Sequence, residues 1–163
     1  MSEILNLNIN KHEKSKSRAS LEKYLNKDIH EFHFYTNDDI LDVFDKDHSL
    51  DVEVWHHSLK LMHATFLFYN RSSFQITDVS QKDWNEMFVR DEFSQKRILE
   101  AAKMVAVSGK TAFNVAQKHE VREAITNGLA HIVEVVAIAP LFGRSKITNQ
   151  VEFIGFVAAV KFH

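Results

Sequence analysis

The sequence predicts an α+β fold with N-terminal antiparallel strands, a central helical segment and a C-terminal long β-hairpin. Three observations support this prediction. Apolar and polar residues alternate with a period of two in several stretches before residue 80. From Ser80 the apolar spacing lengthens to about 3.6 residues, which is typical of helices. Near the C-terminus, two apolar stretches flank a polar loop, as they do in a hairpin.

The first half of the chain is expected to contain one short helix followed by strands. Ser20 is a candidate N-cap for a helix over 21–26. Four stretches suit strands because they alternate or are rich in aromatic and β-branched residues: 29–36, 51–58, 61–70 and 73–78. The polar residues between the last two favour a hairpin turn.

The middle of the chain is expected to be helical. Ser80 and Ser94 are candidate N-caps, and Gly109 suits the left-handed C-cap of the helix that Ser94 begins. The expected helices cover 81–89, 95–107, 112–119 and 121–132.

The C-terminal hairpin is expected to join strands over 132–143 and 151–163 through the polar loop 144–150. Both strands are apolar on both faces. We therefore expect the hairpin to lie in the centre of its sheet or to be covered by another chain.

Length and composition limit the function classes. The chain has 163 residues, 20 Lys and Arg against 22 Asp and Glu, and no cysteine. We expect a single domain over 1–163, with a division into a strand-rich 1–79 and a second part 80–163 as the alternative. The absence of cysteine excludes a disulfide scaffold and a thiol nucleophile, and it favours a cytoplasmic protein. No apolar run approaches the length of a membrane span.

The net charge of −2 hides a segregation of charge along the chain. Residues 11–27 are rich in lysine, so 1–19 are expected to form a flexible basic arm. Residues 28–53 hold nine acids against one lysine. This acidic segment is interpreted either as a solvated face or as a surface for a protein partner.

No group of residues indicates catalysis, and no metal or cofactor is expected. Ser108 to Thr111 match the end of a phosphate-binding loop, but Met104 stands where that motif requires its first glycine. The histidines of the first half lack the spacing of a metal site. The chain is therefore not expected to be an enzyme.

Residues 94–132 resemble the helix-turn-helix of TrfB-type plasmid repressors and PapB-type fimbrial regulators. The resemblance rests on short motifs that surround a turn: Gly109-Lys110-Thr111, Val115-Ala116, Val121 and Ala124-Ile125. Glu120 departs from the pattern, since glycine is usual at that position of the turn. The alternative interpretation is a plain helical layer packed on a sheet.

This resemblance implies contacts with double-stranded DNA. Phosphates would be met by the basic residues Lys110, Lys118, Arg144 and Lys146, with Thr111 at the start of its helix. Base edges would be met by four residues of the recognition helix: Arg122, Glu123, Thr126 and Asn127.

The sequence therefore predicts a sequence-specific DNA-binding transcriptional repressor from a bacterium, plasmid or phage that acts as a homodimer. The alternative is a non-catalytic protein-interaction module, such as an inhibitor, immunity or adaptor protein. That module would use the acidic segment 28–53 and the aromatic strands as its contact surface.

Overall fold

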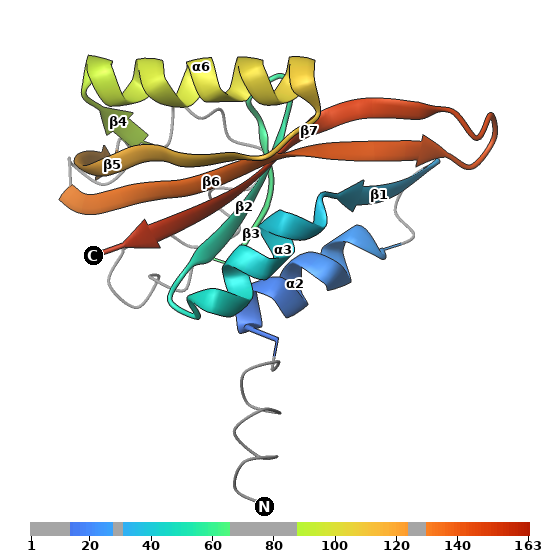
Figure 1. The fold of residues 1–163 in the computed structure, drawn as a ribbon, viewed down its shortest axis with the longest axis horizontal. Coiled ribbons are helices and arrows are strands. Elements are labelled where there is room, and N and C mark those ends of the chain that lie inside the picture. The colour runs from blue at the N-terminus through green and yellow to red at the C-terminus, as the bar shows by residue number, and fades with distance from the viewer. Residues whose placement is uncertain (1–13, 28–30, 66–87, 124–129) are drawn as a thin grey trace, which may run out of the picture.

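The computed structural model describes residues 14–27, 31–65, 88–123 and 130–163. In these ranges an antiparallel sheet lies between helix α6 on one face and helices α2 and α3 on the other (Figure 1). The elements follow in the order α2 (Lys16–Leu25), β1 (Phe32–Thr36), α3 (Asp38–Lys46), β2 (Asp51–His56), β3 (Leu61–Ala64), β4 (Phe88–Arg90), α6 (Glu92–Ser108), β5 (Ala112–Glu123), β6 (Ala130–Ser145) and β7 (Val151–Phe162).

The sheet has the strand order β3-β2-β7-β6-β5-β4. Strand β1 pairs with residues 141–145 of β6, beyond the stretch of β6 that pairs with β5. Strands from both sides of residue 80 therefore share one sheet. In the described ranges, no helix has the length and apolar character needed to cross a membrane.

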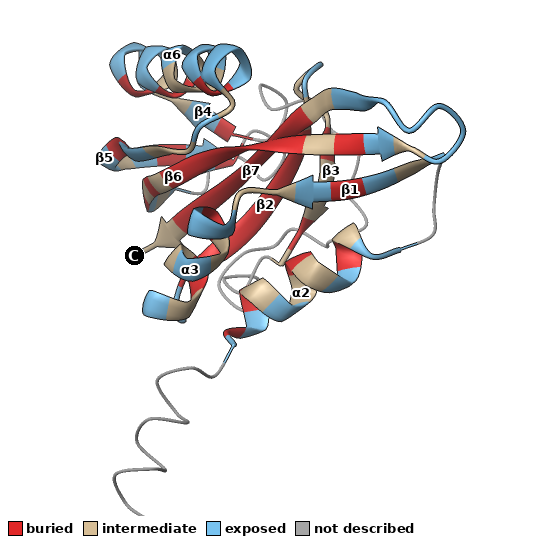
Figure 2. Cartoon of the chain, turned by 45° about the vertical axis from the view of Figure 1, so that its right-hand side comes forward, coloured by how far each residue is buried: buried red, intermediate tan, exposed pale blue. Residues whose placement is uncertain are grey.

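The β6–β7 hairpin forms the centre of the sheet, which explains why it is apolar on both faces. Phe156 and Ala158 belong to the core beneath α6, whereas Val157 and Ala159 belong to the core beneath α2 and α3. Of the two arrangements expected for the hairpin, the central one is present, and the chain's own helices cover both faces (Figure 2).

The predicted helix-turn-helix is wrong, and with it the α+β fold built around a central helical segment. Residues 112–123 form strand β5. The register between β5 and β6 shifts twice, between Phe113 and Ala116 and between Ala116 and His119. Such bulges insert extra residues and break the two-residue alternation of a strand. Val115, Ala116 and Val121 are consequently buried without the regular alternation of a strand.

Other predicted helices begin at different residues. Helix α6 begins at Glu92 because the Asp91 carboxylate, and not Ser94, caps it by accepting a 2.8 Å hydrogen bond from the Ser94 backbone N–H. Helix α2 begins at Lys16 with Ser15 as its N-cap, and Ser20 lies inside it.

Several expectations fall partly or wholly outside the described residues. Phe88 and Val89, expected at the end of a helix, lie in strand β4. The stretches outside the described residues are 1–13 of the arm expected over 1–19, the strand segments and turn over 66–78, the helix over 81–87 and the part of the last helix over 124–129. Residues 16–19 of the expected arm lie in helix α2.

Gly109 ends α6 in the left-handed region, with φ of 69°, as the sequence predicts. A Cβ at this position would have room, since the closest heavy atom would be 3.8 Å away in Phe142. We expect Gly109→Ala to lower the free energy of unfolding by about 1 kcal/mol for conformational reasons alone. Denaturant titration measures this loss. A smaller loss is expected for Gly109→Asn, and equal stability of the wild type and the alanine variant would contradict the account.

Candidate ligand-binding cavity beneath helix α6

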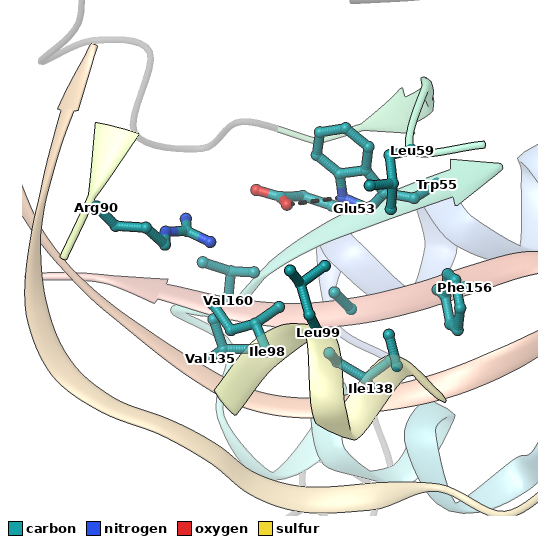
Figure 3. A pocket seen from close by; sticks show the side chains of 12 residues that line it. Glu53, Trp55, Leu59, Arg90, Ile98, Leu99, Val135, Ile138, Phe156 and Val160 are labelled. Atoms are coloured by element: carbon teal, nitrogen blue, oxygen red, sulfur yellow. Dashed lines mark hydrogen bonds between the residues drawn. The ribbon is translucent and has the colours of Figure 1, made fainter. Parts of the chain in front are cut away.

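A cavity of about 60 Å³ lies between α6 and the sheet (Figure 3). Its walls come from strands β2, β4, β6 and β7, from helix α6 and from the turn after β2. The lining residues are Glu53, Trp55, Leu59, Arg90, Ile98, Leu99, Ala102, Val135, Ile138, Phe156, Ala158 and Val160.

Strand β2 places an acidic side chain in this cavity. Because side chains alternate along a strand, Val52 and Val54 face α2 and α3, whereas Glu53 and Trp55 face α6. The Trp55 indole Nε1–H donates a 3.0 Å hydrogen bond to Glu53 Oε1. This bond holds the carboxyl group at the cavity wall.

Arg90 on β4 supplies a cationic group opposite Glu53. Figure 3 shows the guanidinium and the carboxyl group directed toward each other at one end of the cavity. Burial lowers the pKa of Arg90 to about 10, while the charges of Glu53 and Asp91 act in the opposite direction. Arg90 therefore keeps its positive charge at neutral pH.

The pKa of Glu53 is raised to about 7, chiefly because the carboxyl group is buried. The hydrogen bond from Trp55 and the charge of Arg90 lower this pKa, and Asp51 raises it. Near neutral pH both forms of Glu53 are thus populated. The carboxylate can accept hydrogen bonds from a bound molecule, and the protonated form can donate one.

The other end of the cavity is apolar. Ile98, Leu99 and Ala102 line it from α6, and Ile138 and Phe156 line it from the sheet. A volume of about 60 Å³ is several times the roughly 10–15 Å³ that a cavity needs, by the same measure, to hold one water molecule. The cavity therefore suits a molecule with very few non-hydrogen atoms.

The residues predicted to contact DNA do not form one surface. Thr111 ties the turn after α6 to α3, since its hydroxyl donates a 2.5 Å hydrogen bond to Asp39 Oδ1 and accepts one of 3.2 Å from the Asn37 amide. Lys110, beside it, is exposed.

Lys118, Arg122 and Glu123 lie on β5, not on a recognition helix. Arg122 forms a 2.6 Å ion pair with Glu120, and Lys118 is exposed. Glu123 is fully buried, with Oε1 3.4 Å from His131 Nε2, so it does not face a ligand outside the protein. Thr126 and Asn127 lie outside the described residues.

Arg144 and Lys146 lie at the tip of the β6–β7 hairpin, where Arg144 Nη1 donates a 3.2 Å hydrogen bond to the Asn149 carbonyl. Arg122 pairs with Ala130 at the opposite end of β6. An extended strand from 130 to 144 spans roughly 45 Å. Arg122, predicted to meet base edges, and Arg144, predicted to meet a phosphate, are therefore far apart.

The acidic segment 28–53 contains residues that face inward as well as outward. Asp45 pairs with Arg18 of α2, and Asp47 forms a 3.0 Å ion pair with Lys161. Asp51 and Glu53 are buried. Asp38, Asp39 and Asp42 lie on α3, consistent with the interpretation of a solvated helix face.

Sequence reasoning missed Glu53, Trp55 and Arg90 as site residues. One observation on the sequence could have indicated Glu53 and Trp55. Trp55 shares a face with Glu53, opposite Val52 and Val54, so both faces of this strand had to be buried. Nothing comparable indicated Arg90, because its position depends on the pairing of β4 with β5.

Comparisons with known proteins identify the fold and nothing finer. No family model matches the chain, and no curated protein matches it. Among solved structures, the PAS-B domain of Drosophila melanogaster Cycle with bound ethylene glycol matches with a TM-score of 0.51 at 11% identity, over 69% of this chain and 99% of that domain. The fold is PAS-like. A tryptophan-to-alanine variant of that PAS-B domain, with bound glycerol, gives the same TM-score, identity and coverage.

Proposed function

We propose that this chain is a PAS-like sensor module that binds a small molecule in the cavity beneath α6. PAS domains are typically sensor or interaction modules rather than catalysts. The observation that supports the proposal most is the cavity itself, which combines apolar walls with the buried carboxyl group of Glu53 and the half-buried side chain of Arg90 at one end.

The lining favours a short amphipathic ligand. Its apolar part would contact Ile98, Ile138 and Phe156, and its polar end would meet Glu53 and Arg90. Both ethylene glycol and acetate have four non-hydrogen atoms, which matches the size of the cavity. The binding free energy of very small ligands reaches at most about 1.5 kcal/mol per non-hydrogen atom. Four atoms therefore give a Kd no lower than about 40 μM. Millimolar affinity for such probes is therefore expected.

Helix α6 is the element through which binding would be sensed. It supplies one wall of the cavity through Ile98, Leu99 and Ala102, while its opposite side faces solvent. A ligand between α6 and the sheet contacts both layers. Its binding would therefore favour one distance and orientation of α6 over others.

Filling the cavity tests the proposal. Ala102→Leu places a larger side chain in the cavity from α6, and Ala106→Leu makes the same change at an exposed position of that helix. At ten times Kd, acetate or ethylene glycol is expected to stabilise the wild type and Ala106→Leu by about 1.4 kcal/mol at pH 7. Ala102→Leu is expected to lose this stabilisation.

Thermal unfolding at increasing probe concentration measures this stabilisation. Any effect of the probe as a co-solvent, outside the cavity, is common to the wild type, Ala102→Leu and Ala106→Leu and does not distinguish them. Ala158→Val fills the same cavity from β7 and serves if Ala102→Leu is too unstable. The proposal would be contradicted if both probes stabilised the wild type and the cavity-filled variants equally. It would also be contradicted if neither probe stabilised any of the proteins.

DNA binding, the function predicted from the sequence, has lost the helix-turn-helix on which it was based. It stays an untested prediction, as does the alternative of a protein-interaction module. The arrangement of the predicted contact residues does not favour DNA binding, since Arg122 and Arg144 lie at opposite ends of β6.

A further inference from the structure

The outer side of α6 holds a row of exposed residues with a repeating spacing. Phe93, Arg97, Glu100, Met104 and Val107 follow one another at intervals of four, three, four and three residues. This spacing places them on one helix face. The apolar members are Phe93, Met104 and Val107, which are 70%, 68% and 90% exposed. We call these five residues the α6 stripe.

The apolar members of the α6 stripe are not part of the core of this chain. Ile98 and Val105 on the other side of the helix already fill the core against the sheet. Figure 2 shows the outward side of α6 as exposed along its length. Large apolar side chains gathered on an exposed helix face are typical of an interaction surface.

A groove of about 450 Å³ runs beside the stripe, between the N-terminal half of α6 and β5. Phe93 and Arg97 line it from the helix, and residues 116–119 line it from the strand. Arg97 Nε donates a 3.2 Å hydrogen bond to the Val115 carbonyl, and its guanidinium lies 5.8 Å from the centre of the Phe93 ring. These contacts hold Phe93 and Arg97 together at the edge of the groove.

The order of residues in the stripe is self-complementary. Arg97 is four residues after Phe93, and Glu100 is four residues before Met104. A two-fold axis between Arg97 and Glu100 therefore places two copies of the helix antiparallel, with Phe93 of each copy opposite Met104 of the other. The same axis places Arg97 opposite Glu100 twice. A parallel pairing would instead place Arg97 opposite Arg97.

We propose that the α6 stripe is the interface of a homodimer, in which two copies of this chain pair their α6 helices antiparallel. Two apolar Phe93–Met104 contacts flank two Arg97–Glu100 ion pairs. The matched charges select the antiparallel register, since opposite charges across an interface determine register and partner choice. The occupant of the stripe is thus a second copy of this chain.

The C-terminal hairpin, for which contact with another chain was one of two expected arrangements, is covered on both faces within this chain. One pair of helices with 17 residues each forms a small interface, near the low end of specific protein contacts. The dimer is therefore expected to be weak and to form as the protein concentration rises.

Charge exchange tests the proposal. In sedimentation velocity at protein concentrations up to about 1 mM, the wild type is expected to pass from monomer to dimer. Arg97→Glu or Glu100→Arg alone is expected to raise the dimer Kd at least tenfold, because like charges then face each other. The double variant is expected to return the Kd to within about threefold of the wild type, because each pair is restored in reverse order. Lys146→Glu, at the hairpin tip, changes the net charge as Arg97→Glu does and is expected to leave the Kd unchanged.

Met104→Lys provides a second test that does not disturb the Arg97 hydrogen bond. This side chain is exposed, so the variant is expected to fold and to stay monomeric. A wild type that stays monomeric throughout would overturn the proposal and would assign the stripe to another partner. Dimers that persist in Met104→Lys, or a double variant that dimerises no better than the single ones, would also overturn it.

Discussion

Gly155→Ala is expected to cost about 4 kcal/mol of folding free energy or to prevent folding. Gly155 lies opposite His56, where β7 pairs with β2. A Cβ at this position would lie 1.9 Å from the Trp55 carbonyl oxygen and 2.8 Å from the His56 Cα. Both are backbone atoms, so the strands would have to separate. The separation would also move Trp55 at the cavity wall.

Gly143→Ala is the matched control. Its new Cβ would approach side-chain atoms only, at 3.0 and 3.1 Å in Ile154 and 3.1 Å in Phe32. These side chains can adjust, and the expected cost is about 1 kcal/mol. Denaturant titration compares the two variants with the wild type. Equal stability of the two variants would show that close approach of β2 and β7 does not determine the packing at this point.

Glu53→Gln is expected to change the pH dependence of stability. The pKa of Glu53 is about 7 in the folded protein against 4.5 for an ordinary glutamate, so between these values the folded state binds the extra proton. The stabilisation that this proton provides is full below pH 4.5 and is lost as the pH rises through 7. The difference of 2.5 pH units corresponds to about 3 kcal/mol. Relative to Glu53→Gln, the wild type should lose about this amount between pH 4.5 and pH 8.

Comparison with Glu53→Gln separates the contribution of Glu53 to the pH dependence of stability from the contributions of the histidines. Burial lowers the pKa values of His56, His63 and His119, so their contributions increase as the pH rises and oppose that of Glu53. They are common to both proteins and cancel in the difference. Glu152→Gln, an exposed change on β7, is expected to follow the wild type. A difference between the wild type and Glu53→Gln that does not vary with pH would mean that the Glu53 carboxyl group titrates as an ordinary one.

The fold could be predicted only where local pattern and tertiary packing agree. Helix α6 with its Gly109 cap and the β6–β7 hairpin combine a long regular pattern with clear ends, and both are present. The prediction of helices in 112–123 was wrong because the bulges of β5 bury Val115, Ala116 and Val121 at irregular intervals, so these residues lack the alternation that distinguishes a strand from a helix. Pairing with β6, which no local pattern reveals, decides between the two.

The candidate site was less predictable than the fold because it depends on long-range contacts. Glu53 and Arg90 are 37 residues apart and meet only because β2 and β4 border the same cavity beneath α6. In the sequence, Glu53 belongs to an acidic segment, and Arg90 directly follows the helix expected over 81–89. Burial gives both residues their unusual pKa values, and burial follows from the topology.

The Trp55 indole N–H resonance tests the central claim, that a small molecule binds beneath α6, most directly. This N–H donates to Glu53 at the cavity wall, and the chain has two tryptophans, so a Trp84→Phe variant assigns the resonance. Titration of 15N-labelled protein with acetate or ethylene glycol at pH 7 is expected to shift the Trp55 resonance to saturation in the wild type and to leave it in place in Ala102→Leu. A resonance that does not move with either probe, or that moves equally in both proteins, would contradict the claim.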